Sequence, residues 1–156
     1  MIRKTIHDIQ GKVGNEKITC LTAYTAPIAR LLDPYVDILL VGDSLGMVLY
    51  EYENTLPVTI EQMIEHTKSV IKATSSACVI MDLPFGTYEE SKELALNNAL
   101  RSIKETNCAG IKLEGGTLIE ETVKYITDRG IPVMGHIGLQ PQSVVIDGGY
   151  KIKGRD

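Results

Sequence analysis

Six side chains that could do chemistry each follow or end a short apolar run of the sequence. Such a run is typical of a strand buried on both faces. In parallel α/β folds the carboxyl ends of the strands converge on the ligand. We therefore expect these side chains to share one site. They are Asp43, Ser44, Asp82, Lys112, Glu114 and His136.

Three of these residues, Asp43, Asp82 and Glu114, are carboxylates suited to a hard divalent cation. Mg²⁺ prefers oxygen ligands and keeps several waters, so one or two direct carboxylates with a water-bridged third make a reasonable site. Any one of these acids, taken alone, is more simply a helix cap or a solvated loop residue. Their places at successive strand ends, with Lys112 two residues before Glu114 and so on the same face, favour a metal site.

The basic side chains have more than one interpretation. Lys112 could only neutralise the nearby acids, or it could bind the carboxylate of a substrate. His136 follows an apolar strand, where a histidine often has only a structural hydrogen bond. The other histidines, His7 and His66, fall in polar, surface-type helical positions and are given no role.

The elements that must position these side chains alternate between strands and helices. The predicted strands are Ile18 to Ala23, Ile38 to Gly42, Cys78 to Met81, Gly110 to Leu113 and Ile131 to Gly135. Amphipathic helices fill the intervals, with one long loop after the second strand. Such alternation makes a parallel sheet, either open and doubly wound or part of a (β/α)₈ barrel. Polar residues at four successive strand ends favour the barrel, and no GxGxxG or GxxxxGK[ST] loop supports a nucleotide-binding open sheet.

Several helix starts carry recognisable caps. Capping boxes are predicted for three pairs: Thr59 with Gln62, Thr87 with Glu90, and Thr117 with Glu120. Shorter helices are expected from Pro27 to about Leu32, with Thr25 as N-cap, and around Thr5 to Gln10. Gly130 is placed where a helix end favours a left-handed residue.

Composition sets limits on location and partners. A chain of 156 residues suits a single domain. Its net charge of −4 gives no basic surface for nucleic acid, and its apolar runs are far shorter than a membrane span of ~20 residues. No signal peptide is evident at the N-terminus. Cys20, Cys78 and Cys108 show no CxxC spacing. Cys20 and Cys78 lie inside apolar runs and are expected to be small buried residues of a cytoplasmic protein.

Seven motifs together carry a family resemblance. They are LTAY at 21–24, LLVGDSLGMV at 39–48, TLPVT at 55–59, DLPFG at 82–86, KLEGG at 112–116, PVMGHIGLQPQSV at 132–144 and GGYKIKGR at 148–155. In this order they make the chain, from about Thr19 to Arg155, resemble the ketopantoate hydroxymethyltransferase family.

The resemblance implies a (β/α)₈ TIM barrel of the phosphoenolpyruvate/pyruvate-binding type, of which about five strands are present, usually assembled as a homodecamer. Mg²⁺ would be bound by Asp43 and Asp82, with Glu114 in its shell. The substrates would be a 2-oxo acid, 3-methyl-2-oxobutanoate, and 5,10-methylenetetrahydrofolate as the one-carbon donor. Substrate contacts would come from Asp43, Ser44, Asp82, Lys112 and His136.

The resemblance also implies that a catalytic group is missing from this chain. The family's general base is a glutamate at the end of the sixth strand, beyond Asp156, so no catalytic residue is assigned and the domain 1–156 is expected to lack three strands. The chain would then be a truncated or split hydroxymethyltransferase, or an inactive fragment that keeps the metal and oxo-acid half of the site. An isocitrate lyase or phosphonomutase relative is a weaker interpretation, because no KxCGH motif is present.

A short esterase-like motif in the sequence does not indicate an esterase. Residues 42–45 read GDSL, which matches the nucleophile block of one esterase class. That chemistry needs a histidine base, usually within DxxH. The residues three before the histidines are Val133, Met63 and Lys4, so the hydrolase interpretation is poor.

Overall fold

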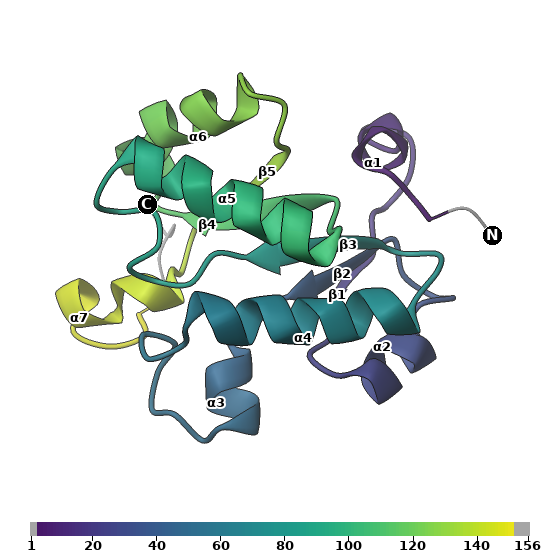
Figure 1. The fold of residues 1–156 in the computed structure, drawn as a ribbon, viewed down its shortest axis with the longest axis horizontal. Coiled ribbons are helices and arrows are strands. Elements are labelled where there is room, and N and C mark those ends of the chain that lie inside the picture. The colour runs from purple at the N-terminus through teal and green to yellow at the C-terminus, as the bar shows by residue number, and fades with distance from the viewer. Residues whose placement is uncertain (1–2, 152–156) are drawn as a thin grey trace.

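The computed structural model describes residues 3–151, and the last four residues of the GGYKIKGR motif lie outside this range. Five parallel strands form one sheet in the order β1-β2-β3-β4-β5 (Figure 1). An open doubly wound sheet reverses its strand order at a switch point. The strictly sequential order is that of a barrel wall, which confirms the barrel expectation. The strands are β1 (Cys20–Thr22), β2 (Ile38–Val41), β3 (Cys78–Asp82), β4 (Gly110–Glu114) and β5 (Val133–His136).

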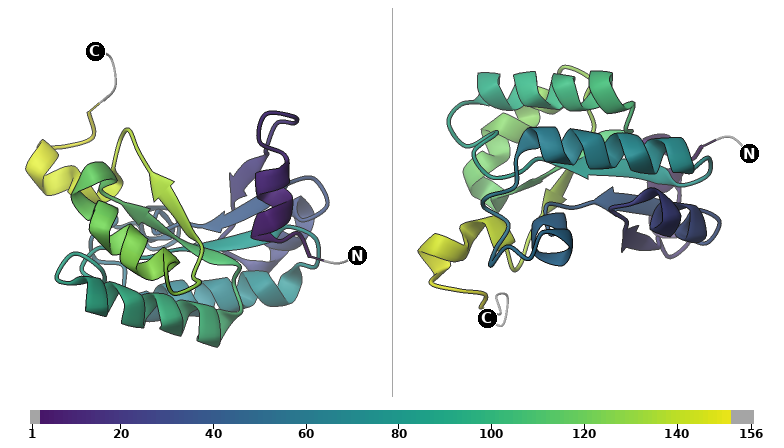
Figure 2. Two further views of the ribbon diagram at one scale, coloured as in Figure 1. Left: turned by 90° about the horizontal axis from the view of Figure 1, so that it is seen from above. Right: turned by 60° about the horizontal axis from the view of Figure 1, so that its bottom comes forward.

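Helices cover the two faces of the sheet unequally. Four helices follow one another along the outer face, where α4 packs between α2 and α5, and α5 between α4 and α6 (Figure 2). They are α2 (Ala26–Leu32), α4 (Ile60–Ala73), α5 (Lys92–Thr106) and α6 (Glu120–Thr127). The short helix α1 (Ile6–Gly11) lies on the opposite, inner face. The arrangement is part of a barrel wall together with the helices that cover its outer face.

Two-residue alternation along the strands divides the core into two clusters. Leu39, Val79, Met81 and Ile111 belong to the large cluster beneath the outer helices. The small inner cluster is Ile38, Cys78 and Ile80, against which Ile6 and Ile9 of α1 pack. The inner face is therefore apolar near the start of the strands, and α1 covers it there.

The edge strands differ from the prediction of uniformly buried strands. All three residues of β1 are exposed, and the strand is shorter than expected. Cys20, predicted to be buried, is exposed, whereas Cys78 and Cys108 are buried. In β5 no residue is fully buried. The physical reason is that each of these strands has only one neighbouring strand within residues 3–151.

Two of the three predicted capping boxes are wrong. The box at Thr59 forms, with both reciprocal hydrogen bonds to Gln62. Helix α5 instead begins after Ser91, because the hydroxyl of Thr87 donates to Pro84 O and keeps that segment in a turn. Thr117 lies inside a 3₁₀ helix, Gly116–Ile119 (η1), and α6 starts after Ile119 without a side-chain cap.

The remaining short elements match the expectations in part. Thr5 caps α1 with a full capping box, and Gly130 is left-handed as expected. Thr25 precedes α2, but its side chain makes no capping hydrogen bond. The predicted long loop after β2 contains a helix, α3 (Leu45–Leu49), and the segment after β5 forms η2 (Pro141–Ser143) and α7 (Val144–Asp147). No helix within residues 3–151 combines the length and apolar character needed to span a bilayer.

Asp37, just before β2, connects the N-terminal segment and the residue before β1 to the sheet. Its carboxylate accepts hydrogen bonds from the backbone N–H and the hydroxyl of Thr19, both at 3.0 Å. It also pairs with the ammonium groups of Lys4 at 3.1 Å and Lys12 at 3.0 Å. The Thr19 amide, together with the two lysines, lowers the pKa of Asp37 well below its ordinary value despite burial.

The pKa of Asp37 predicts a specific acid sensitivity. A carboxyl with a folded-state pKa below its unfolded value, ~3.9, stabilises the fold above that value and loses this contribution as pH falls towards the folded-state pKa. We expect the melting temperature to fall below about pH 4 less steeply in Asp37→Asn than in wild type, from a lower starting value at pH 7. Thermal unfolding followed by circular dichroism would measure this. Asp128→Asn, at an exposed pair with Lys124, should keep the wild-type slope, and an unchanged slope in Asp37→Asn would contradict the assignment.

The two edge strands predict self-association of the isolated chain. Unpaired backbone groups along an edge template pairing with another chain, and Leu21 of β1 is 49% exposed. Size-exclusion chromatography of the 156-residue chain should show oligomers or aggregates. Leu21→Lys should reduce association, because a lysine on an edge opposes pairing. A monodisperse wild-type monomer with a steep unfolding transition would contradict this expectation.

Candidate functional site

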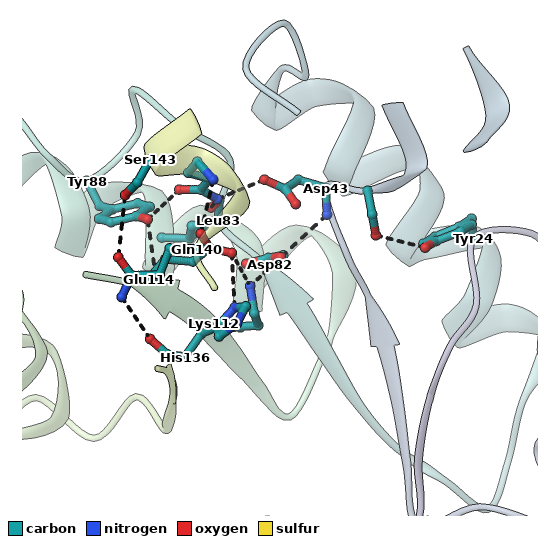
Figure 3. Close-up of polar contacts among 12 residues, drawn as sticks. Tyr24, Asp43, Asp82, Leu83, Tyr88, Lys112, Glu114, His136, Gln140 and Ser143 are labelled. Atoms are coloured by element: carbon teal, nitrogen blue, oxygen red, sulfur yellow. Dashed lines mark hydrogen bonds and ion pairs between the residues drawn. The ribbon is translucent and has the colours of Figure 1, made fainter. Parts of the chain in front are cut away.

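Alternation and register bring the predicted side chains onto the inner face at the carboxyl ends of the strands. Asp82 lies opposite Lys112 in the β3–β4 ladder, and Glu114 lies opposite His136 in the β4–β5 ladder. These four residues have the same parity as the inner cluster of Ile38, Cys78 and Ile80. Figure 3 shows them meeting above the strand ends, with Asp43 nearby. The inner face of the sheet is therefore apolar near the start of the strands and charged at their carboxyl ends.

The ammonium of Lys112 is the centre of this cluster. Its Nζ lies 2.7 Å from Asp82 Oδ2 and 3.1 Å from Glu114 Oε1, and the exposed fractions of the three side chains are 8%, 2% and 3%. Glu114 Oε1 also lies 3.0 Å from His136 Nδ1. One cation thus holds two buried carboxylates from adjacent strands, as the neutralising interpretation of Lys112 requires.

Asp43 and Asp82 lie together although 39 positions separate them. The backbone N–H of Asp43 points to Asp82 Oδ2 at 3.5 Å, and both residues are buried. Burial raises the pKa of Asp82 above its ordinary value against the opposing charge of Lys112, and burial likewise raises the pKa of Asp43. Both shifts reflect burial, which disfavours the charged form of a carboxyl more than the nearby Lys112 favours it.

One oxygen of this cluster has no protein partner. Asp82 Oδ1 is buried and makes no hydrogen bond within residues 3–151. A buried carboxylate oxygen without a partner is costly. Asp82 shares the ammonium of Lys112 with Glu114, and a third acid, Asp43, lies close by. A divalent cation would satisfy both the orphaned oxygen and the surplus negative charge. The donor set of Asp43 and Asp82 therefore fits Mg²⁺.

Glu114 is placed differently from the other two acids. Its Oε1 faces Lys112 and His136, and its Oε2 accepts the backbone N–H of Gln142 at 3.1 Å. Lys112 lies between Glu114 and Asp82. Within residues 3–151, no group of three acidic, histidine or cysteine side chains is placed to hold a metal ion.

Ser44 stands at the edge of the site, beside a residue that the sequence did not indicate. It precedes α3, and its Oγ lies 2.8 Å from the hydroxyl of Tyr24, which follows β1. Gly42 keeps this corner open, since a Cβ there would come within 3.0 Å of Ser44 Oγ. The loops after β1 and β2 thereby place a pair of hydroxyls next to Asp43.

Two further buried residues at the site were missed by sequence reasoning. Gln142, in η2, donates to the Asp43 carboxylate. Tyr88, in the loop after β3, donates to the Gln142 side chain and accepts from the backbone N–H of Glu114. Gln142 falls within a motif that carries the family resemblance, and this was the available signal. A polar residue in a loop points to a site only when it is also buried, and burial of a loop cannot be read from periodicity.

A cavity of about 300 Å³ opens beside Glu114. Its walls include Phe85 and Tyr88 from the loop after β3, Leu118 from η1 and Gln142 from η2. The carboxylate cluster thus has an adjoining space with aromatic and aliphatic walls, bounded by the loops that follow three successive strands.

Sequence comparison relates the chain to one enzyme family. The family described as ketopantoate hydroxymethyltransferase matches residues 3–156. Among curated relatives named 3-methyl-2-oxobutanoate hydroxymethyltransferase, the one from Paramagnetospirillum magneticum is 58% identical over 153 residues, which are 98% of this chain and 56% of the relative. The one from Parvibaculum lavamentivorans is 56% identical over 99% of this chain and 56% of its own length. The chain spans about half the length of the curated relatives it matches.

Solved structures show the same fold at low identity. The 2,3-dimethylmalate lyase of the PEP mutase/isocitrate lyase superfamily superimposes with a TM-score of 0.61 at 14% identity, over 86% of this chain and 51% of that one. Oxaloacetate acetylhydrolase gives a TM-score of 0.55 at 11% identity, over 81% and 50%. The five strands and their helices therefore have the fold of about half of each of these two chains.

The position of Lys112 predicts a large stability effect. Removing one partner of a buried ion pair leaves an uncompensated buried charge and costs about 3–5 kcal/mol. Lys112→Met, which keeps the apolar stem, should lower the free energy of unfolding by about this amount in urea titrations at pH 7. Lys124→Met is the matched control, because Lys124 pairs with Asp128 at 2.8 Å on the surface, and it should unfold close to wild type. Equal stabilities of the two variants would show that Lys112 does not compensate the acids.

Proposed function

The chain belongs to the ketopantoate hydroxymethyltransferase family, and we propose that it provides the metal and oxo-acid half of an enzyme that makes ketopantoate for pantothenate biosynthesis. The reaction would transfer a hydroxymethyl group from 5,10-methylenetetrahydrofolate to C3 of 3-methyl-2-oxobutanoate. The observation that carries the proposal is the buried Asp82 Oδ1, which has no hydrogen-bond partner among residues 3–151. Asp82 lies next to Asp43 at the carboxyl ends of the strands.

The metal requirement follows from the chemistry of the donor set. Asp43 and Asp82 would hold Mg²⁺, with Glu114 in its outer shell, and bound Mg²⁺ would supply Lewis-acid stabilisation of negative charge on the keto oxygen. Asp43 and Asp82 come from adjacent strand ends, so the sheet itself fixes their separation. The same two carboxylates, together with Lys112, would border the bound oxo acid.

The other residues of the site would bind and orient the substrate. The carboxylates around Lys112 raise its pKa against the effect of burial, so its ammonium stays charged and can pair with the carboxylate of a 2-oxo acid. The hydroxyl of Ser44, next to Asp43 in the chain, can donate a second hydrogen bond. His136, held by Glu114, would complete the polar rim on the β5 side.

The group that accepts the C3 proton is proposed to lie outside this chain. By resemblance it is a glutamate at the end of a sixth strand, so residues 1–156 would supply binding without the base. The completed barrel would be a cytoplasmic homo-oligomer, a decamer by resemblance. Because the chain spans about half of its relatives, an inactive fragment that retains the half-site is the alternative.

Complementation in solution distinguishes these alternatives. The chain alone should exchange the C3 proton of 3-methyl-2-oxobutanoate at least ~10²-fold more slowly than a full-length relative, because a general base contributes ~10²–10⁴-fold. Co-expression with the part of the Paramagnetospirillum magneticum relative that this chain does not cover should restore exchange and hydroxymethyl transfer, both followed by NMR.

The controls make the outcome specific. Asp82→Asn in the restored complex should abolish both reactions, whereas Asp128→Asn on the surface should leave them unchanged. Fast exchange by the chain alone would place a base within residues 1–156, with His136 the first candidate. A stable complex that stays inactive, with no Mg²⁺-dependent binding of the oxo acid, would favour the inactive fragment.

A further inference from the structure

Tyr88 and Gln142 form a buried hydrogen-bonded pair among the carboxylates of the proposed metal site. They are 3% and 5% exposed. The Tyr88 hydroxyl donates to Gln142 Oε1. They come from loops after different strands, β3 and β5. Gln142 contacts the carboxylates of Asp43 and Glu114, and Tyr88 contacts the backbone of Glu114. The pair touches parts of the site that are far apart in sequence.

The side-chain amide of Gln142 is fully used. Its Nε2 donates to Asp43 Oδ2 at 2.8 Å and to Leu83 O at 2.9 Å. Both of these atoms are acceptors only, which fixes the amide with its nitrogen towards Asp43 and its oxygen towards Tyr88. The contact with Asp43 joins residues 99 positions apart. One oxygen of Asp43 is therefore held in place by Gln142.

The same pair also holds Glu114. The backbone N–H of Gln142 donates to Glu114 Oε2 at 3.1 Å, and the backbone N–H of Glu114 donates to the Tyr88 hydroxyl at 3.2 Å. Gln142 also donates to the carbonyl oxygen of Leu83, the residue that follows Asp82. All three acids of the cluster are thus connected, directly or through one residue, to one tyrosine and one glutamine.

We propose that Tyr88 and Gln142 are positioning residues that set the affinity of this site for a divalent cation by fixing the Asp43 and Glu114 carboxylates. The inference rests on the proposed function, since it concerns the same metal. Neither residue contacts the cation. Replacing a hydrogen-bond partner of a metal ligand typically costs about 10–100-fold in metal affinity, because the freed carboxylate turns to other partners. Here the ammonium of Lys112 is the nearest competitor for Asp82 and Glu114.

The test measures binding of Mn²⁺ alone, from the EPR signal of the free ion, in the 156-residue chain. Gln142→Met keeps the length of the side chain and removes its hydrogen bonds, and Tyr88→Phe removes one oxygen. Both should weaken Mn²⁺ binding about 10-fold or more. The matched control is Asn98→Leu, because the Asn98 amide is also buried and donates to a loop carbonyl, Thr87 O at 2.7 Å, but touches no carboxylate. It should bind Mn²⁺ as wild type does.

Each other outcome overturns the proposal in a recognisable way. Wild-type affinity in both Gln142→Met and Tyr88→Phe would overturn the positioning role and leave the metal site standing. Equal weakening in Asn98→Leu would show loss of general stability instead of positioning. A wild-type chain that binds no Mn²⁺ would overturn the metal part of the proposed function together with this inference. If circular dichroism shows that Gln142→Met is unfolded, Tyr88→Phe decides.

Discussion

The ion cluster centred on Lys112 is the interaction on which the site depends. Three buried carboxylates within one barrel mouth repel one another, and each loses solvation on burial. Lys112 makes the arrangement tolerable by lying between Asp82 and Glu114, and the β3–β4 register fixes it there. The compensation is incomplete, because one oxygen of Asp82 has no hydrogen-bond partner among residues 3–151. The fold thus stabilises the cluster enough to form while leaving it short of positive charge, which is the property expected of a cation site.

The meeting of the charged residues could be predicted from sequence because it depends on two regular features. Parallel strands end at the same edge of a sheet, and side chains two residues apart share a face. Asp82, Lys112, Glu114 and His136 obey both rules, so their neighbourhood follows from strand positions alone. The capping box at Thr59 was equally accessible, since both partners lie within one helical turn.

The errors have a common origin in contacts that are irregular or distant. Thr87 has the residue pattern of a cap, but a local turn uses its hydroxyl first. Strand β1 has the composition of a buried strand, yet its exposure depends on what lies beside it. Gln142 reaches Asp43 across the barrel mouth from a loop whose path no periodicity describes. Sequence patterns specify what an element prefers, whereas these features depend on which other elements arrive next to it.

Helix α1, seated on the inner face, links the order of synthesis to the order of folding. Ile6 and Ile9 are synthesised before their partners Ile38, Cys78 and Ile80, which belong to strands that come later in the chain. The helix is short, and short helices are marginal on their own in water. The helix α1 can therefore form stably only after β2 and β3 have paired. Covering of the inner face by α1 is then a late step of folding that depends on contacts between distant parts of the chain.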